Sequence, residues 1–255
     1  MSIHIERPAS RELILTELKP VIAGVTDICI SLFGSRLQSV YLLGSAARGE
    51  YKPGISDFDV RAIVSGKKEG EKEKVDQTAA PLQKEFNVAK MELDAYTVDA
   101  LNKRDWLQFY VLVDGICVWG NPYEPTSPLP TTREALAAML ASHLLEHYER
   151  TPQTLERIKA GIEKGDSETW RTYAKRAMRL GNTIAILKTG QYTQNSDNMA
   201  ALVAENVPEI SEPIEKLNQY RLYPPEDLEG FIDLAHQAEI VRSAVLEYGL
   251  QKLGK

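Results

Sequence analysis

The sequence predicts an α+β fold, in which an N-terminal domain with a mixed β-sheet and flanking helices precedes an all-α helical-bundle domain. Short apolar or alternating segments, which are typical of strands, all lie before residue 121. Residues 121–132, "NPYEPTSPLPTT", hold four prolines, which neither continue a helix nor occupy a central strand. Beyond them the apolar spacing is helical. We therefore expect one domain over residues 1–122, a Pro-rich linker over 121–132 and a helical domain over 133–255.

Apolar periodicity predicts the elements of the N-terminal domain in order. The opening helix begins with Ser10 ahead of Glu12 and continues with apolar residues at helical spacing. A charge-mixed stretch predicts a solvated loop that runs into a helix. The expected segments are a helix over 9–33, a buried strand "SVYLLG" over 39–44, a strand "DFDVRAIV" over 57–64, the charged loop over 65–77, a strand "VAKMELDAYTV" over 88–98 and mixed or extended structure over 106–120.

The second domain carries helical apolar spacing almost throughout, with few strand signals. The expected helices cover residues 133–150, 152–164, 167–189, 196–204, 210–219 and 226–252.

Charge and cysteine content limit the classes of function. The chain has 30 basic and 36 acidic residues, a formal net charge of −6, so it has no global basic field for non-specific nucleic-acid binding, and no nucleic-acid partner is expected. The two cysteines, Cys29 and Cys117, lie in apolar settings and predict buried free thiols in a reducing compartment. The N-terminus shows no basic segment followed by a long apolar one, and no window approaches a membrane-spanning run. We expect a cytoplasmic protein without membrane association.

Two aspartates in the predicted strand over 57–64 pose an electrostatic problem. Asp57 and Asp59 point to the same face of the strand, about 7 Å apart along the backbone, where like charges repel. A hard divalent cation relieves that repulsion, and Mg²⁺ prefers one or two carboxylates together with substrate phosphates. Upstream, Gly44 lets the backbone approach a ligand closely, and the Ser45 hydroxyl can donate to a phosphate oxygen. The pattern predicts a metal site beside a phosphate site.

Gly44-Ser45, an intervening loop and then Ser56-Asp57-Phe58-Asp59 resemble the G-S…D-x-D signature of the DNA-polymerase-β-like nucleotidyltransferase superfamily. That superfamily adds a third carboxylate from a later strand. Glu92 lies between apolar neighbours as the third acid of the family does, whereas Asp94, two residues on, faces the same way and remains a rival. We prefer Glu92.

The resemblance implies a mechanism with two Mg²⁺ ions held by Asp57, Asp59 and Glu92. In that mechanism an acceptor hydroxyl attacks the α-phosphorus of a nucleoside triphosphate and pyrophosphate leaves. Gly44, Ser45, Arg48 and Ser56 are then the expected nucleotide contacts in this domain. Arg61 alternates onto the face of the two aspartates, where it could pair with them or with phosphate.

Size and layout resemble the aminoglycoside nucleotidyltransferases, antibiotic-resistance enzymes with a helical second domain. The segment "HLLEHYER" (143–150) resembles the kanamycin-type enzymes, in which a glutamate of this helix is the general base and a basic residue one turn later meets the nucleotide. The resemblance assigns these roles to Glu146 and Arg150. A solvated i, i+4 pair is the alternative.

Residues 172–202 resemble the helix, T-G turn and following helix of the spectinomycin/streptomycin group. In that group a lysine soon after the turn reaches the phosphates. Here Asp197 follows Ser196, where the group pattern has a Ser-Lys pair.

We therefore predict a nucleotidyltransferase that transfers AMP from ATP to a hydroxyl of a small molecule, with an aminoglycoside as the first candidate acceptor. Two alternatives stay open: a protein AMP-transferase of antitoxin type, and a non-catalytic nucleotide-binding module of the same fold. Some members of the superfamily build the site between two subunits, so a homodimer also stays open.

Overall fold

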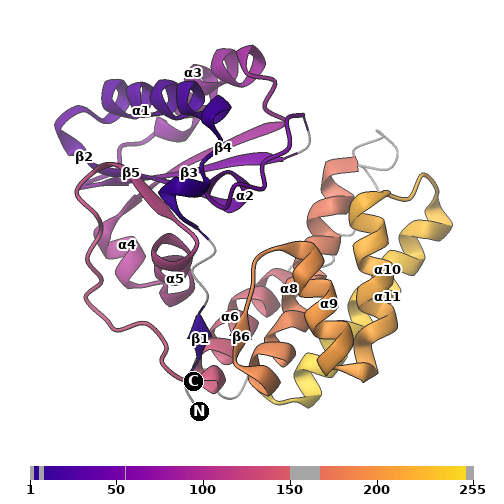
Figure 1. The fold of residues 1–255 in the computed structure, drawn as a ribbon. Helices are drawn as coiled ribbons and strands as arrows, with labels where there is room; N and C mark the ends of the chain where they lie inside the picture. Colours follow the sequence, from indigo (N-terminus) through magenta and orange to yellow (C-terminus); the bar gives the residue numbers. More distant parts are fainter. Residues whose placement is uncertain (1–2, 6–8, 55, 150–166, 251–255) are drawn as a thin grey trace. The chain divides into compact units, whose positions relative to one another are not determined.

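The structure, a computed structural model, describes residues 3–5, 9–54, 56–149 and 167–250 of the chain (Figure 1). The chain divides into two compact units, and the division falls inside the Pro-rich stretch: Arg7–Leu129 form one unit, called here the sheet unit, and Met1–Glu6 with Pro130–Lys255 form the other, the helical unit. The α+β fold class is confirmed, with a mixed four-stranded sheet, flanking helices and a helical C-terminal region.

The elements of the sheet unit follow one another with short connections. In chain order they are η1 (Arg11–Leu13), η2 (Thr16–Leu18), α1 (Lys19–Phe33), η3 (Gly34–Arg36), β2 (Leu37–Leu43), α2 (Gly44–Ala47), β3 (Asp57–Val64), α3 (Glu71–Glu85), β4 (Lys90–Thr97), α4 (Val98–Asn102), α5 (Asp105–Val113) and β5 (Ile116–Gly120).

The strands of the sheet unit run in the order β4-β3-β2-β5. Strand β2 is antiparallel to both β3 and β5, and β3 is parallel to β4. Parallel neighbours need a crossover, and α3 supplies it between β3 and β4. The parallel pair matters for the site, because it fixes which residues of β3 and β4 lie side by side.

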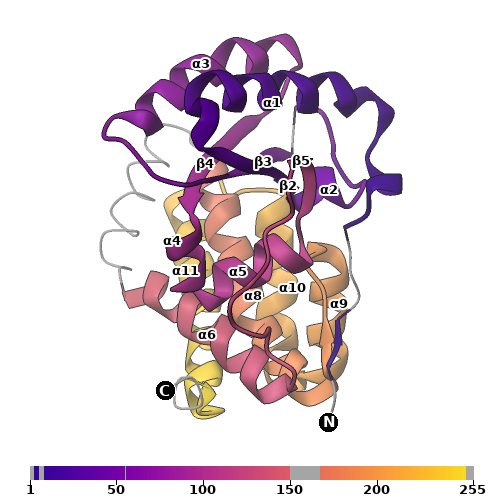
Figure 2. The same ribbon diagram turned by 90° about the vertical axis from the view of Figure 1, so that its left-hand side faces the viewer.

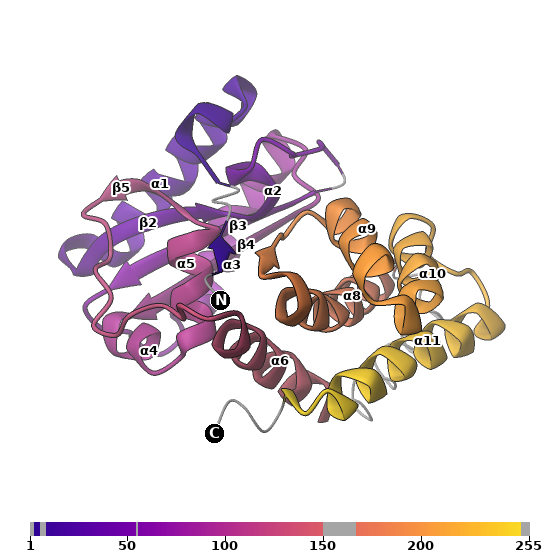
Figure 3. The same ribbon diagram turned by 60° about the horizontal axis from the view of Figure 1, so that its bottom comes forward.

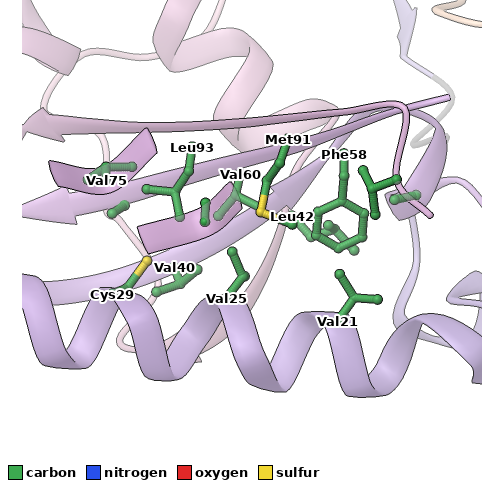
Figure 4. Packing of buried hydrophobic residues seen from close by; sticks show 14 of the residues in the cluster. Val21, Val25, Cys29, Val40, Leu42, Phe58, Val60, Val75, Met91 and Leu93 are labelled. Carbon is green, nitrogen blue, oxygen red and sulfur yellow. The ribbon is translucent and has the colours of Figure 1, made fainter. Parts of the chain in front are cut away.

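One face of the sheet is covered by α1 and α3 (Figures 1 and 2). Figure 4 shows the packing: side chains of α1 point toward apolar side chains of the three strands β2, β3 and β4. Burial of these side chains is the main source of stability for the unit. The residues labelled in that view are Val21, Val25, Cys29, Val40, Leu42, Phe58, Val60, Val75, Met91 and Leu93.

The opposite face of the sheet is partly covered by α4 and α5, whose side chains pack on Tyr41, Leu43 and Ile63. The same face also carries Asp57 and Asp59, which are half-buried and belong to neither apolar cluster. Asp59 lies opposite Leu43 across the β2–β3 pair, so the acidic residues directly adjoin the apolar part of this face.

The opening helix is shorter than predicted. The sequence pattern favoured one helix over 9–33, but two 3₁₀ turns precede α1, which begins at Lys19. Pro20 explains the difference: it sits in the first turn of α1, where its missing N–H costs no hydrogen bond, and it disfavours helical conformation in the residue before it.

The same region also corrects the expectation about membrane spans. Thr16–Arg36 is long and apolar enough to cross a membrane by length and composition alone, with a mean hydropathy of 1.4 over its most apolar window. Val21, Val25 and Cys29 are buried against the sheet, and 33% of that window is buried inside the structure.

The two cysteines differ in burial. Both are free thiols, as predicted. Cys29 is fully buried, and its burial raises the pKa of the thiol to about 12. Cys117 on β5 is only half-buried, and its thiol donates to the carbonyl oxygen of Trp119 at 3.3 Å. The prediction of a core position is therefore correct for Cys29 and wrong for Cys117.

The helical unit is built around α8, which packs against α6, α9, α10 and α11 (Figure 3). One two-stranded parallel ladder joins β1 to β6, so the unit is not all-α, and residues at the start of the chain belong with it rather than with the sheet. The predicted helix over 152–164 lies outside the described residues. The elements are β1 (His4–Ile5), α6 (Arg133–Glu149), α8 (Ser167–Thr189), β6 (Gln191–Tyr192), α9 (Ser196–Asn206), η4 (Pro208–Ile210), α10 (Ser211–Leu222) and α11 (Leu228–Glu247).

Candidate active site

Strand β3 presents the two predicted aspartates on one face. Its burial alternates: Phe58 and Val60 are buried beneath α1 and α3, whereas Asp57, Asp59 and Arg61 are half-buried on the opposite face. The alternation that the sequence predicted is therefore present in the structure, and the core contacts of one face fix the direction in which the acids of the other point.

The parallel register of β3 and β4 brings a third acid to the pair. Asp59 lies opposite Glu92, Asp57 opposite Lys90 and Arg61 opposite Asp94. Glu92 and Asp59 are close enough for their side chains to interact directly. Gly44, the first residue of α2, completes this group, because Leu43 at the end of β2 lies opposite Asp59. Segments that are distant in the sequence thus meet at one end of the sheet.

Asp94, the rival third acid, has different partners. Its carboxylate lies 3.1 Å from Lys72 Nζ of α3 and 3.7 Å from an Arg61 nitrogen. The register places Asp94 one step further along β4, opposite Arg61 rather than opposite an aspartate. These contacts favour Glu92 as the third metal ligand, which stays a prediction.

Both the backbone conformation at position 44 and the contact with Asp59 require a glycine there. Its φ is +69°, a left-handed conformation that L side chains rarely adopt. A Cβ at this position would overlap the Oδ2 atom of Asp59. The glycine therefore lets the turn after β2 lie directly against the Asp59 carboxylate.

Arg61 is a fixed positive charge among the acids. Its Nη1 donates to two backbone carbonyls, of Val60 at 2.9 Å and of Glu92 at 3.0 Å. Its Nη2 lies 3.9 Å from Asp59 Oδ1 and 3.7 Å from Glu92 Oε2. The sequence left open whether Arg61 pairs with the acids or with phosphate, and in the structure it pairs with the acids.

Lys90 is the second cation at Glu92, with Nζ 2.8 Å from Oε1. Burial alone would raise the pKa of Glu92, but the hydrogen bond and charge of Lys90, with the charge of Arg61, outweigh it. The pKa of Glu92 therefore lies below its ordinary value. Glu92 is ionised at neutral pH, as a metal ligand must be.

Two further residues near the acids were missed by the sequence reasoning. Lys90 lies two residues before Glu92, so strand alternation alone could have placed it on the acidic face. Tyr51 is buried, packs edge-on against Phe58 with ring centroids 6.1 Å apart, and has its pKa raised by burial and by the charge of Asp57. Its position in a loop before β3 gave no signal in the sequence.

The other nucleotide contacts predicted for this domain have varied surroundings. Ser45 is half-buried in α2. The Ser56 hydroxyl accepts the N–H of Lys52 at 3.0 Å and so closes the loop before β3. Arg48 donates from Nε to Glu50 at 3.0 Å, and only 10% of its side chain is exposed. Because a guanidinium carries five N–H donors, Arg48 could contact a phosphate through its Nη groups while this ion pair persists.

The residues predicted from the helical unit are less defined. Glu146 is exposed on α6, and Arg150 lies outside the described residues. The predicted turn after α8 is present: the helix ends at Thr189, Gly190 has a φ of +75°, and α9 begins at Ser196. Asp197, at the position where the group pattern has lysine, pairs with Arg221.

The chemistry of the donors suits a hard cation, although their present arrangement is not that of a metal site. Asp57, Asp59 and Glu92 offer carboxylate oxygens on one face, which are the ligands that Mg²⁺ prefers. Within the described ranges, no group of three or more His, Cys, Asp or Glu side chains lies in an arrangement that could hold a metal ion. Lys90 and Arg61 pair with the acids instead.

Part of the chain matches a known family of domains. Residues 22–112 match the family model of the nucleotidyltransferase domain. The matched segment runs from α1 into α5 and contains Gly44, Asp57, Asp59 and Glu92. Residues 22–112 of the chain therefore match a nucleotidyltransferase domain.

Among solved structures, the chain is similar to the spectinomycin adenyltransferase AAD(9) from Enterococcus faecialis, crystallised with ATP and spectinomycin. The TM-score is 0.58 at 15% sequence identity, and the match covers 89% of this chain and 98% of that one. At this identity the likeness shows a common fold over both units. Among curated proteins, none matches the sequence.

Proposed function

We propose that the protein is a Mg²⁺-dependent enzyme that transfers AMP from ATP to a hydroxyl of a small molecule of the aminoglycoside type and releases pyrophosphate. The observation that carries the proposal is the parallel register that sets Glu92 beside Asp59, next to Gly44. It assembles three carboxylates and a glycine turn within a domain that matches the nucleotidyltransferase family.

Asp57, Asp59 and Glu92 are the residues that would hold the metal. When bound, Mg²⁺ would supply Lewis acidity that raises the acidity of the acceptor hydroxyl and neutralises charge on the triphosphate. The chain prepares these ligands by keeping Glu92 ionised through Lys90 and Arg61. Two strands anchored in the core hold the three carboxylates, which limits the reorganisation needed for catalysis.

Gly44 and Ser45 are the proposed triphosphate contacts. The left-handed turn at Gly44 lies directly against the Asp59 carboxylate, and the hydroxyl of Ser45, the next residue, can donate to a phosphate there. Arg48, Ser56 and Arg150 remain further proposed contacts. Glu146 is the proposed general base, because a carboxylate is a suitable base for a hydroxyl whose acidity is already raised.

Two observations support a small cationic acceptor. The chain is acidic, with a formal net charge of −6, and an acidic surface attracts amino-sugar cations and repels nucleic acids. AAD(9), which has a similar fold, was crystallised with spectinomycin. We therefore propose for this chain an acceptor of the aminoglycoside type, the class suggested by a protein of similar fold.

Pyrophosphate release, measured over a panel of aminoglycosides with ATP, GTP, CTP and UTP in turn, tests the proposal. We expect turnover with ATP and at least one aminoglycoside, and a loss of more than about 100-fold in kcat/KM for Asp57→Asn. Asp27→Asn, which neutralises an exposed aspartate of α1, is the matched control and should retain activity.

Other outcomes separate the alternatives. Silence over the panel combined with transfer of radiolabelled AMP to protein would replace the antibiotic acceptor by a protein side chain. Tight Mg²⁺-ATP binding without turnover of any acceptor would indicate a nucleotide-binding module.

A further inference from the structure

We propose that a hollow on the sheet unit, away from the acidic residues, binds a small aromatic amine, meaning a flat apolar ring that carries one ammonium group. The hollow, called here the β2–β5 hollow, has a volume of about 830 Å³. It is lined by residues 37–39 of β2, by residues 119–124 from the end of β5 onward, by Ile63 of β3 and by Val98 of α4. All of these residues belong to the sheet unit, and the volume lies within the range of small-molecule sites.

The β2–β5 hollow is separate from the acidic residues of β3. Ser39, which lines the hollow, lies opposite Ile63, whereas Leu43, at the other end of β2, lies opposite Asp59. Four residues of a strand span about 13 Å. A ligand in the hollow would therefore lie at a different part of the sheet from the proposed metal and triphosphate contacts, so the inference goes beyond the proposed transfer reaction.

Hydrogen bonds to the sheet and to α5 hold the wall that follows β5. The N–H of Asn121 donates to the carbonyl oxygen of Gln38 at 3.2 Å, and the N–H of Tyr123 donates to the buried Tyr41 hydroxyl at 2.6 Å. The Tyr123 hydroxyl in turn accepts from Gln108 Nε2 at 2.8 Å. The wall is therefore built before a ligand arrives, and a preformed site loses less conformational entropy on binding.

The charge of the lining decides between classes of ligand. Among the described residues that line the β2–β5 hollow, Glu124 is the only acidic or basic one, and it is exposed. An ammonium group complements its carboxylate. A phosphate or a carboxylate ligand would meet no positively charged side chain in that lining, so the lining favours a cation over an anion.

The indole of Trp119 gives the hollow an aromatic wall. Trp119 is 37% exposed although it is a large apolar residue, and it shares the lining with Ile63 and Val98. A flat ring can stack on the indole and cover apolar surface that water would otherwise contact, and the face of an indole also attracts a cation. The ligand class therefore combines a ring with an ammonium group.

Ser39 is a second, independent indication of a ligand. The residue is 1% exposed, and its hydroxyl oxygen has no hydrogen-bond partner among the described residues. Buried polar atoms in folded proteins nearly always have a partner. An unpaired hydroxyl in the lining of the hollow therefore marks a place where a polar group of a ligand can bind.

Titration of the full chain with three probes that share a benzene ring tests the inference. The probes are 2-phenylethylamine, which carries an ammonium, 2-phenylethanol, which is neutral, and phenylacetate, which carries a carboxylate; saturation-transfer NMR follows their binding. We expect 2-phenylethylamine to bind with a Kd of about 1 mM, in keeping with its few atoms. The neutral probe should bind about threefold more weakly, as for the loss of one exposed ion pair, and phenylacetate more weakly still.

Variants of two exposed residues locate the binding. Glu124→Gln should remove the preference for the ammonium probe. Trp119→Ala should weaken the binding of 2-phenylethylamine and 2-phenylethanol by about fivefold, whereas Trp119→Phe retains a ring and should retain most of the affinity. Glu85→Gln changes an exposed carboxylate at the end of α3, outside the lining, and is the matched control that should keep the preference.

Equal affinity for the three probes, no saturable binding to the unaltered chain, or equal changes in Glu124→Gln and Glu85→Gln would overturn the inference. A dimer in sedimentation velocity that dissociates in Trp119→Ala would also overturn it, because a second copy of the chain would then cover the hollow. None of these measurements depends on turnover, so this inference and the proposed transfer reaction can fail independently.

Discussion

The two faces of β3 carry different functions on one backbone. Toward α1 and α3 the strand presents Phe58, Val60, Ala62 and Val64, each at most 1% exposed. Toward the other side it presents Asp57, Asp59 and Arg61, all half-buried. A slip of one residue would exchange the two sets, so burial of the apolar face is what fixes the position of the acids. The positions of the acidic side chains therefore depend on the packing of the core on the other face of the same strand.

Truncation of the apolar face should have the largest effect on stability. Phe58 is fully buried, so Phe58→Ala removes a large ring from the core and should lower the free energy of unfolding by about 3–5 kcal/mol. Urea unfolding followed by circular dichroism measures the loss. Phe58→Leu, which retains more apolar volume, should lose clearly less. Equal stability of Phe58→Ala and the unaltered chain would contradict the core role given to Phe58.

A change at the acidic face should affect turnover more than stability. Gly44→Ala places a methyl group against Asp59 Oδ2 and forces that carboxylate to move. We expect kcat/KM to fall by about 100-fold, with a stability loss of about 1–3 kcal/mol from the positive φ. Pyrophosphate release and urea unfolding measure the two quantities.

Gly70→Ala provides the control for that change. Gly70 has nearly the same backbone conformation, with a φ of +71°, but no atom lies within 4 Å of a Cβ placed there. It should show a comparable stability loss with activity retained. Equal losses of activity at Gly44 and Gly70 would contradict the role given to the contact with Asp59.

The sequence allowed β3 and its acids to be predicted because the signals are local. Alternation over "DFDVRAIV" fixed both the bounds of the strand and the shared face of Asp57 and Asp59. The choice between Glu92 and Asp94 could not be made this way, since both have the same parity. It depends on the register between β3 and β4, which is set by packing and by the crossover through α3.

Other features depended on contacts that leave no local signal. The pairing of β1 with β6 joins residues almost two hundred positions apart, and it moved the start of the chain into the helical unit. The later start of the opening helix did have a local signal, because Pro20 favours the first turn of a helix. The prediction gave more weight to the apolar periodicity that begins before it. The cations Arg61, Lys72 and Lys90 surround the acids only once two strands and a helix are packed together.

The smallest expected effect is the pH dependence that the acidic face adds to stability. The pKa of Glu92 in the folded chain lies below its ordinary value of 4.5, through Lys90 and Arg61 and against the effect of burial. A depressed folded-state pKa contributes stability above the unfolded value, and that contribution is lost as the pH falls through the folded value. Urea unfolding without metal between about pH 3 and pH 7 should therefore show the unaltered chain losing stability relative to Glu92→Gln below about pH 4.5. Lys90 is the strongest of the partners that lower the pKa of Glu92. In a Lys90→Met background, the stability difference between the chain with Glu92 and its Glu92→Gln variant should therefore depend less on pH. In a Phe58→Leu background, the pH dependence of that difference should be unchanged. If the unaltered chain instead gained stability relative to Glu92→Gln as the pH fell, burial and not the cations would govern the pKa of Glu92. The ionised Glu92 carboxylate would then destabilise the fold.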